Sequence, residues 1–254
     1  MNKKLFPTVL LPLALLIAST ASAQEPAAPK PDTWAATVDL AFSGASGNDR
    51  TVLLTSGFKI SHLKKERFEL EWSGSVRYGK SEGHEVARNL KSGVKLDLIP
   101  RATWSPFITV DAERDPFRKL DVRTNSGAGV KYTFWHSAAG TASLSAAVLH
   151  SYEDFTSDPD LPLEPQHSAR WSWRFKGNRI IGERVRVENT TFYQPVWDRG
   201  SQYLLNMDSS LRVPMTRRIS MALSHSYARD SNAPPGVHKD DHLVKAGLTI
   251  ETRW

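Results

Sequence analysis

Two histidine–serine pairs are the residues whose types are best suited to nucleophilic catalysis. They are His150-Ser151, followed by Tyr152, and His225-Ser226, followed by Tyr227. An acyl hydrolase needs the serine hydroxyl within hydrogen-bonding reach of the histidine. Neighbouring residues on a strand point to opposite faces, so an extended backbone keeps the two side chains apart. A hydrolase is therefore the alternative hypothesis, and histidines that belong to an interfacial aromatic band are the preferred interpretation.

A second candidate lies near the C-terminus, where His238 precedes Asp240-Asp241-His242. The spacing places the Asp240 carboxylate and the His242 imidazole on one face of an extended chain, an arrangement that an aspartyl-type protease or a transition-metal site could use. Either would need further acidic residues, and spacing supports none of the candidates, which are Asp158, Asp160 and Glu113. We predict a solvated polar loop here, with no catalytic residue, no cofactor and no metal.

The elements that carry these residues are strands, because apolar and polar residues alternate from residue 34 onward. In the clearest stretch, residues 68–78, Leu70, Trp72 and Val76 alternate with Glu71, Ser73 and Arg77. A period of two is typical of a β-strand with two different faces. About twelve such strands follow one another, joined alternately by longer polar segments and by short turns.

A closed barrel explains this pattern better than a soluble periplasmic β-sandwich, which stays a third hypothesis. Long loops at one end, short turns at the other and an even strand number are typical of outer-membrane barrels. Aromatic residues at the strand ends would form the two interfacial girdles of such a barrel. They are Trp34, Trp72, Tyr78, Trp104, Phe134, Tyr152, Phe155, Tyr203, Tyr227 and Trp254.

The last strand predicts how the barrel closes. In HLVKAGLTIETRW, Val244, Leu248, Ile250 and Trp254 share one face, opposite charged and small residues. A membrane tolerates no open sheet edge, so the first strand must pair with the last. By resemblance, an apolar series ending in an aromatic residue is also the signal that the barrel-assembly machinery recognises.

The N-terminus carries the features of an export signal. Lys3 and Lys4 precede an apolar run, and Ala21-Ser22-Ala23 forms a cleavage site. We therefore divide the chain into a signal peptide (1–23), a proline-rich periplasmic tether (24–33) and a barrel (34–254). The net charge of +6 falls to +4 without Lys3 and Lys4, which gives no argument for a nucleic-acid partner. The absence of cysteine excludes disulfides and thiolate chemistry.

The polar face of the strands would line the lumen of the barrel. Arg170, Arg174, Arg184 and Arg186 come from two consecutive strands and are expected to form one cationic patch. Opposite charges come from an earlier run of strands, so the field across the lumen could orient a polar solute; ion-pair filling of a closed barrel is the other possibility. The remaining expected lining residues are Glu69, Glu71, Lys95, Asp97, Asp111, Glu113, Asp121 and Arg123.

Two motifs resemble a known family. Ser46-Gly47-Asn48-Asp49-Arg50-Thr51 is similar to an S-G-N-x-x-T element, and the segment from Asp121-Val122-Arg123 to Gly127-Ala128-Gly129-Val130-Lys131-Tyr132 is similar to a D-x-R…G-x-G-x-x-Y pattern. Both resemble the salt-induced outer-membrane proteins, DUF481, a domain of unknown function. The resemblance implies an outer-membrane barrel linked to salt or osmotic conditions, with no established substrate or reaction.

Together these features predict an all-β, antiparallel transmembrane β-barrel of about twelve strands, with short periplasmic turns and longer extracellular loops, in the bacterial outer membrane. We expect a narrow, charge-lined, porin-like channel or a structural barrel of the envelope, and no enzyme. The expected partners are outer-membrane lipids, the barrel-assembly machinery through the strand ending at Trp254, and small solutes or ions.

Overall fold

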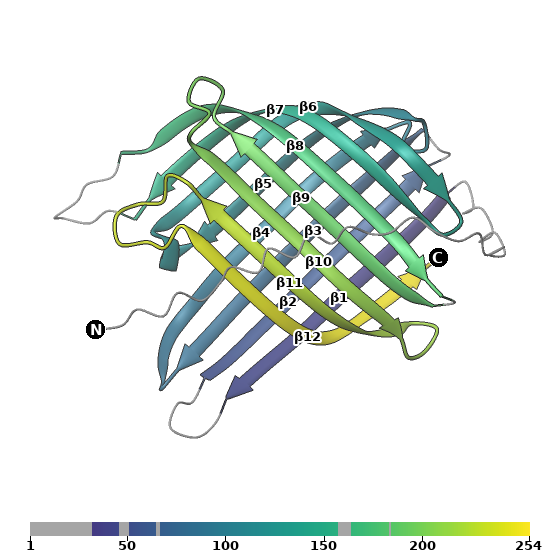
Figure 1. The fold of residues 1–254 in the computed structure, drawn as a ribbon, viewed down its shortest axis with the longest axis horizontal. Coiled ribbons are helices and arrows are strands. Elements are labelled where there is room, and N and C mark those ends of the chain that lie inside the picture. The colour runs from purple at the N-terminus through teal and green to yellow at the C-terminus, as the bar shows by residue number, and fades with distance from the viewer. Residues whose placement is uncertain (1–31, 46–50, 65–66, 157–163, 183) are drawn as a thin grey trace, which may run out of the picture.

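The computed structural model describes residues 32–45, 51–64, 67–156, 164–182 and 184–254. The expected signal peptide, most of the tether and residues 46–50 of the first family motif lie outside this part of the chain. The described residues form one short 3₁₀ helix, η1 (Pro116–Arg118), and twelve strands (Figure 1). The strands are β1 (Asp32–Ala45), β2 (Thr51–Lys64), β3 (Phe68–Ser81), β4 (His84–Leu98), β5 (Trp104–Asp115), β6 (Leu120–Ser137), β7 (Gly140–Phe155), β8 (Gln166–Ile181), β9 (Val185–Pro195), β10 (Tyr203–Pro214), β11 (Ile219–Asp230) and β12 (Asp240–Arg253).

The strands form a single closed antiparallel barrel, as the alternation predicted. Each strand pairs with its neighbours in sequence, and β1 pairs with β12 in the register Ala35↔Arg253 to Ala41↔Gly247. At the end of this seam, the Trp34 amide donates to the Trp254 carbonyl oxygen at 2.9 Å, and the Trp254 amide donates back at 3.0 Å. The prediction that the last strand closes the barrel is confirmed.

The distribution of buried residues is the inverse of that in a soluble domain. Among the described residues, fourteen polar or charged residues but only seven apolar ones are buried. Large apolar side chains instead cover the outer surface; Trp72 and Val76 of β3, for example, are 48% and 47% exposed. A soluble protein rarely exposes so large a continuous apolar area. The outer face is therefore suited to contact with hydrocarbon.

The aromatic residues expected at the strand ends divide into two groups. Trp34, Trp72, Trp104 and Trp254 lie on the exposed outer face, as expected for girdle residues. Phe155, by contrast, is buried, and it pairs with the buried Leu120 where β6 and β7 meet. Its assignment to the girdle was wrong, because the side chain packs inward.

Connections at the two ends of the barrel differ. We call the end of the barrel at which the odd-numbered strands finish the loop end. The segments that follow these strands are 46–50, 82–83, 116–119, 156–165, 196–202 and 231–239. The turns after even-numbered strands, with β1's start and Trp254, lie at the opposite side, the turn end. The connection between β3 and β4 follows an odd-numbered strand but is only a tight turn, in which Glu82 and Gly83 have φ values of 51° and 84°. Positive φ at both central residues is what a two-residue hairpin turn requires. No helix in the described part of the chain has the length and apolar character needed to span a membrane.

Glycines allow neighbouring strands to approach closely at several places in the barrel wall, two of which lie at Gly127 and Gly247. A Cβ atom on Gly127 would lie 2.1 Å from the carbonyl oxygen of Val148 on β7, and one on Gly247 would lie 2.1 Å from that of Leu40 on β1. Real Cβ atoms do not approach backbone this closely, so both positions require glycine. The two sites, β6–β7 and β12–β1, lie six strands apart in the closed order and therefore on opposite sides of the barrel.

Candidate functional site: the charged lumen

The lumen contains a cavity of about 620 Å³. Inward-facing residues of β1–β6 and β9–β12, together with Arg118 of η1, line it. Many of these residues are hydroxyl or amide side chains, including Thr55, Ser73, Thr190, Asn206 and Ser224. Charged side chains of both signs complete the lining, including Asp39, Lys91, Asp111, Glu188, Asp208, Arg212 and Lys245. The cavity therefore carries polar groups and charges of both signs beside some apolar ones, and it matches no single sign of charge.

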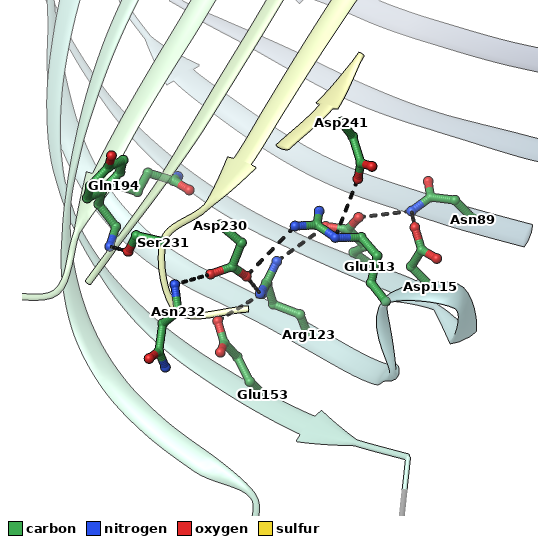
Figure 2. A network of polar contacts seen from close by, with 12 residues as sticks. Asn89, Glu113, Asp115, Arg123, Glu153, Gln194, Asp230, Ser231, Asn232 and Asp241 are labelled. Atoms are coloured by element: carbon green, nitrogen blue, oxygen red, sulfur yellow. Dashed lines mark hydrogen bonds and ion pairs between the residues drawn. The ribbon is translucent and has the colours of Figure 1, made fainter. Parts of the chain in front are cut away.

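A network of buried ion pairs centred on Arg123 of β6 lies at the loop end. The Arg123 guanidinium donates through Nε to Glu153 at 2.8 Å and through Nη2 to Asp230 at 3.2 Å, and it lies 3.8 Å from Glu113 (Figure 2). Arg170 donates to the same Glu153 oxygen at 3.0 Å. The side chains of Arg123, Glu153 and Arg170 are all less than 10% exposed. A planar guanidinium with five donors can serve three carboxylates at once, which explains why arginine occupies the centre.

This network connects distant walls of the barrel. Arg123 belongs to β6 and Asp230 ends β11, five strands further along the closed order. Arg118 of η1 reaches the same region and lies 3.9 Å from Asp230 and 3.7 Å from Asp241. The ion pairs therefore cross the lumen from one wall to another and narrow its loop end.

Glu113 joins the Arg123 network to a second group of polar residues on β3–β5. Asn89 donates to Glu113 at 2.9 Å and to Asp115 at 3.0 Å, as Figure 2 shows. Lys91 lies 3.1 Å from Glu113, and Arg77 lies 3.6 Å from Asp115. Asn89 thus separates two carboxylates and satisfies both, so this part of the lumen wall is held by hydrogen bonds as well as by charge.

A second ion cluster surrounds Arg212 of β10, nearer the turn end. Arg212 lies 2.9 Å from Glu251, 3.5 Å from Glu188 and 3.8 Å from Asp39. Arg212 lines the luminal cavity and also a separate cavity of about 600 Å³. Residues of the turns, including Arg184 and Arg217, line this second cavity. The Arg212 cluster therefore lies between the luminal cavity and a vestibule at the turn end.

The four arginines expected to form one cationic patch are distributed along the barrel. Arg170 belongs to the Arg123 network, and Arg186 lies 3.9 Å from Glu251, a carboxylate that it shares with Arg212. Arg184 is exposed in the turn before β9. Arg174 is stacked against two rings, 5.5 Å from the centroid of Phe107 and 5.7 Å from that of Phe192. The expectation of one patch was wrong, because residues spaced along tilted strands lie at different heights.

The expected acidic wall is largely neutralised by local partners. Asp97 lies 2.6 Å from Lys95 and 3.5 Å from Lys131, and Glu71 lies 3.9 Å from Lys59. Asp111 accepts a hydrogen bond from Asn125 at 2.7 Å. Glu113 and Arg123 are paired in the loop-end network, and Glu69 is half-buried on β3. Opposite charges are thus interleaved within each wall, which differs from the expected separation of charge across the lumen.

One of the expected lining residues faces the other way. Asp121 is paired at 2.9 Å with Arg114, and the two side chains are 50% and 58% exposed. The register of β6 against β7 shifts between Leu120 and Val122, so Asp121 is the extra residue of a β-bulge. A bulge breaks the alternation of faces. The assignment of Asp121 to the lumen was wrong for this reason.

The histidine and the serine of each histidine–serine pair make separate contacts. Rings of His150 and His167 lie 5.5 Å apart, whereas Ser151 is fully buried. His225 contacts His242, while the Ser226 hydroxyl donates to Asp208 at 2.6 Å. Asp240 accepts hydrogen bonds from Tyr227 and Arg229, and Asp241 lies near Arg118. Among the described residues no group of three or more His, Cys, Asp or Glu side chains is arranged to hold a metal; Asp158 and Asp160 lie outside this part of the chain.

Sequence reasoning missed Glu153, Asp230, Arg212, Glu188 and Glu251 as site residues. Glu153 and Asp230 lie at or near the ends of β7 and β11, where the alternation gives way to polar connecting segments. The alternation of β7 does carry a signal for Glu153, because it is the direct cross-strand partner of Arg123. No pattern within the sequence indicates the contact between Arg123 and Asp230, since only closure of the barrel brings β6 and β11 together.

Comparisons with known proteins agree with this fold. No curated protein matches the sequence. The outer-membrane channel COG4313 from Pseudomonas putida F1 is 10% identical, with a TM-score of 0.51 over 92% of this chain and 100% of the other. The NanC porin is 10% identical, with a TM-score of 0.48 over 85% and 97%. At such low identity these likenesses concern the fold alone. The family model described as "Protein of unknown function, DUF481" matches residues 38–251, and the chain belongs to this family.

Proposed function

We propose that this protein is a narrow outer-membrane channel for small hydrophilic solutes or ions. The observation that carries the proposal is the polar luminal cavity of about 620 Å³ inside a closed barrel with an apolar outer face. Eight-stranded barrels fill with side chains and sixteen-stranded barrels leave an aqueous channel, so twelve strands permit a lumen that is only partly filled. The passage runs from the vestibule past Arg212, through the cavity, to the Arg123 network.

Two further expectations belong to this proposal. Insertion by the barrel-assembly machinery is supported by the apolar outer series of β12, in which Val244, Leu248 and Ile250 are all exposed. Export by a signal peptide rests on the sequence alone, on Lys3, Lys4 and the Ala21-Ser22-Ala23 site. The loop end would then face the exterior and the turn end the periplasm, as in other outer-membrane barrels. A link to salt conditions and the absence of enzymatic activity stay predictions.

The proposal is tested by single-channel recording of the refolded mature protein in a planar bilayer. Potassium chloride is compared with a large anion (potassium gluconate) and with a large cation (N-methylglucamine chloride). We expect small, discrete conductance steps, reduced by both large ions. A barrel that is folded, as shown by heat-modifiable migration, but electrically silent would contradict the channel and favour a structural barrel. Alanine at His150, His225 and His242 should leave the conductance unchanged, whereas it would abolish a hydrolase.

Replacing Arg212 with glutamine should increase the preference of the channel for cations severalfold. The substitution removes the positive charge that Glu251, Glu188 and Asp39 share. Arg186 remains 4.0 Å from Glu188 and 3.9 Å from Glu251, so three carboxylates face one arginine at the passage between the vestibule and the cavity. Fixed negative charge in a narrow passage attracts cations and repels anions. The measurement is the reversal potential in a potassium chloride gradient.

Arg217→Gln is the matched control for this prediction. Arg217 lines the same vestibule but is exposed, so water and salt screen its charge. It should leave the reversal potential nearly unchanged. An equal shift in both variants would show that selectivity is set by the total charge of the vestibule and that the Arg212 cluster is not the selective passage.

A further inference from the structure

A three-residue constellation occurs twice on the outer face of the barrel. In the hairpin β7–β8 it consists of His150, Tyr152 and His167, and in the hairpin β11–β12 of His225, Tyr227 and His242. The two histidines of each set are separated by 17 residues. Four of the eight histidines of the chain are therefore gathered in two pairs, each close to the loop end of its hairpin.

The strand register explains why the ring spacings of the two sets are alike, although the two histidine rings are inclined by 35° in the first set and by 12° in the second. Tyr152 is the direct cross-strand partner of His167, and Tyr227 is that of His242, so the first histidine of each set lies diagonal to the second. Ring centroids of the two histidines are 5.5 Å apart in the first set and 5.6 Å in the second. The tyrosine ring lies 4.9 Å from His167 and 4.7 Å from His242. Each tyrosine thus packs against the second histidine and restricts its ring.

The nitrogen atoms of the second pair are spaced as two ligands of one metal ion would be. His225 Nε2 and His242 Nδ1 are 3.3 Å apart. A tetrahedral ion with bonds of about 2.0–2.1 Å to imidazole nitrogens holds two such nitrogens about 3.3 Å apart. Without an ion these two nitrogens share one proton in a hydrogen bond. An ion can replace that proton after a small tilt of both rings, while the other nitrogen of each ring keeps its hydrogen.

The neighbouring side chains leave such an ion open to further ligands at the loop-end border of the outer face. His150, His167 and His242 are exposed and His225 is half-buried. The nearby Asp240 carboxylate is occupied by Tyr227 at 2.6 Å and by Arg229 at 2.9 Å. Two imidazoles with open coordination positions favour late first-row divalent ions, in the order that places Cu²⁺ first.

We infer that each histidine pair binds one late first-row divalent transition-metal ion on the outer face of the barrel, with Cu²⁺ preferred over Zn²⁺. The binding would be independent of conduction, because both pairs face away from the lumen. It goes beyond the proposed channel and does not depend on it.

The full-length, tag-free protein in detergent is treated with EDTA and then titrated with CuCl₂. Calorimetry measures the stoichiometry and affinity of binding, and electron paramagnetic resonance identifies the nitrogen ligands. We expect two equivalents of Cu²⁺, each with hyperfine coupling to two nitrogens. The double variant H225A/H242A should lose one equivalent, H150A/H167A the other, and the quadruple variant both. Zn²⁺ should bind with the same stoichiometry and lower affinity.

His62→Ala is the matched control for the titration. His62 also lies on the outer wall, but its ring stacks on Trp34 at 4.3 Å and packs against Phe68, and its nearest ring partners include no second histidine. This variant should retain both equivalents. Unchanged stoichiometry in the double variants, or coupling to a single nitrogen, would overturn the inference. Heat-modifiable migration verifies that every variant is folded, and His242→Gln, which keeps a polar side chain of similar size, provides a second test of the β11–β12 site.

Discussion

Alanine in place of Arg123 should increase the single-channel conductance severalfold and make the channel prefer cations. Arg123 is the centre of the ion pairs that cross the loop end of the lumen, and its loss leaves Glu153, Glu113 and Asp230 without the charge that holds them together. The removed side chain widens the passage and takes away one positive charge, and each carboxylate then keeps only its cation on the wall: Arg170 for Glu153, Lys91 for Glu113 and Arg118 for Asp230. Breaking a buried pair by removing one partner should also lower the free energy of unfolding by about 3–5 kcal/mol.

Two measurements separate these effects. Planar-bilayer recording gives the conductance and the reversal potential, and urea unfolding followed by tryptophan fluorescence gives the stability. Arg114→Ala is the matched control, since the Arg114–Asp121 pair is exposed on the outer face of adjacent strands. Exposed pairs contribute about 0–1 kcal/mol, so this variant should behave like the wild-type protein. A conductance of Arg123→Ala equal to that of the wild type would show that the loop-end network does not limit the passage.

The fold was predictable because a barrel repeats one simple pattern. In β3 the period of two separates Trp72 and Val76 from Glu71 and Arg77, and the structure places the first pair on the outer face and the second pair inside. The same period in β12, combined with the requirement that a membrane leaves no open edge, predicted the pairing of β1 with β12. Local alternation therefore determines both the faces and the closure.

The site was predictable only where strand parity alone determines a side chain's surroundings. Lys95 and Asp97 face inward as expected and pair with each other. Asp121 does not, because a bulge of one residue reverses its face, and the sequence gives no sign of that bulge. The partner of Arg123 on β11 was out of reach for another reason. Which residues meet across a lumen depends on the tilt and stagger of all twelve strands, which no single strand encodes.

The interleaving of charge along the walls weakens the electric field across the lumen. Where a charge has an opposite charge on its own or a neighbouring strand, as Glu71 has Lys59 and Asp97 has Lys95, the net field across the lumen is small. Selectivity then depends on the two places where the passage crosses an arginine shared by several carboxylates, Arg212 and Arg123. This is why single substitutions at these residues are expected to change conduction more than substitutions along the walls.

Alanine in place of Gly247 should prevent normal folding of the barrel. The added methyl group would lie 2.1 Å from the Leu40 carbonyl oxygen and 2.7 Å from the Ala41 Cα, both backbone atoms of β1, across the seam that closes the barrel. Neither atom can move without breaking hydrogen bonds between β1 and β12. Overpacking of this kind costs about 1–3 kcal/mol where side chains can adjust, and more where they cannot. We therefore expect a large loss of the heat-modifiable form on refolding and a lower urea midpoint for the remaining folded fraction.

Gly57→Ala distinguishes a local steric cause from a general intolerance of alanine in the lumen. Gly57 also lies on the inner wall, but its nearest neighbour for a Cβ atom is the Gly74 carbonyl oxygen at 3.6 Å, an ordinary contact. This variant should refold as well as the wild-type protein, because the added methyl group meets only ordinary van der Waals contacts. Gly127→Ala, with a clash of 2.1 Å on the opposite side of the barrel, should resemble Gly247→Ala. Equal refolding of all three variants would mean that the seam and the β6–β7 wall can relax. The close approach of neighbouring strands at these positions would then not explain the presence of glycine.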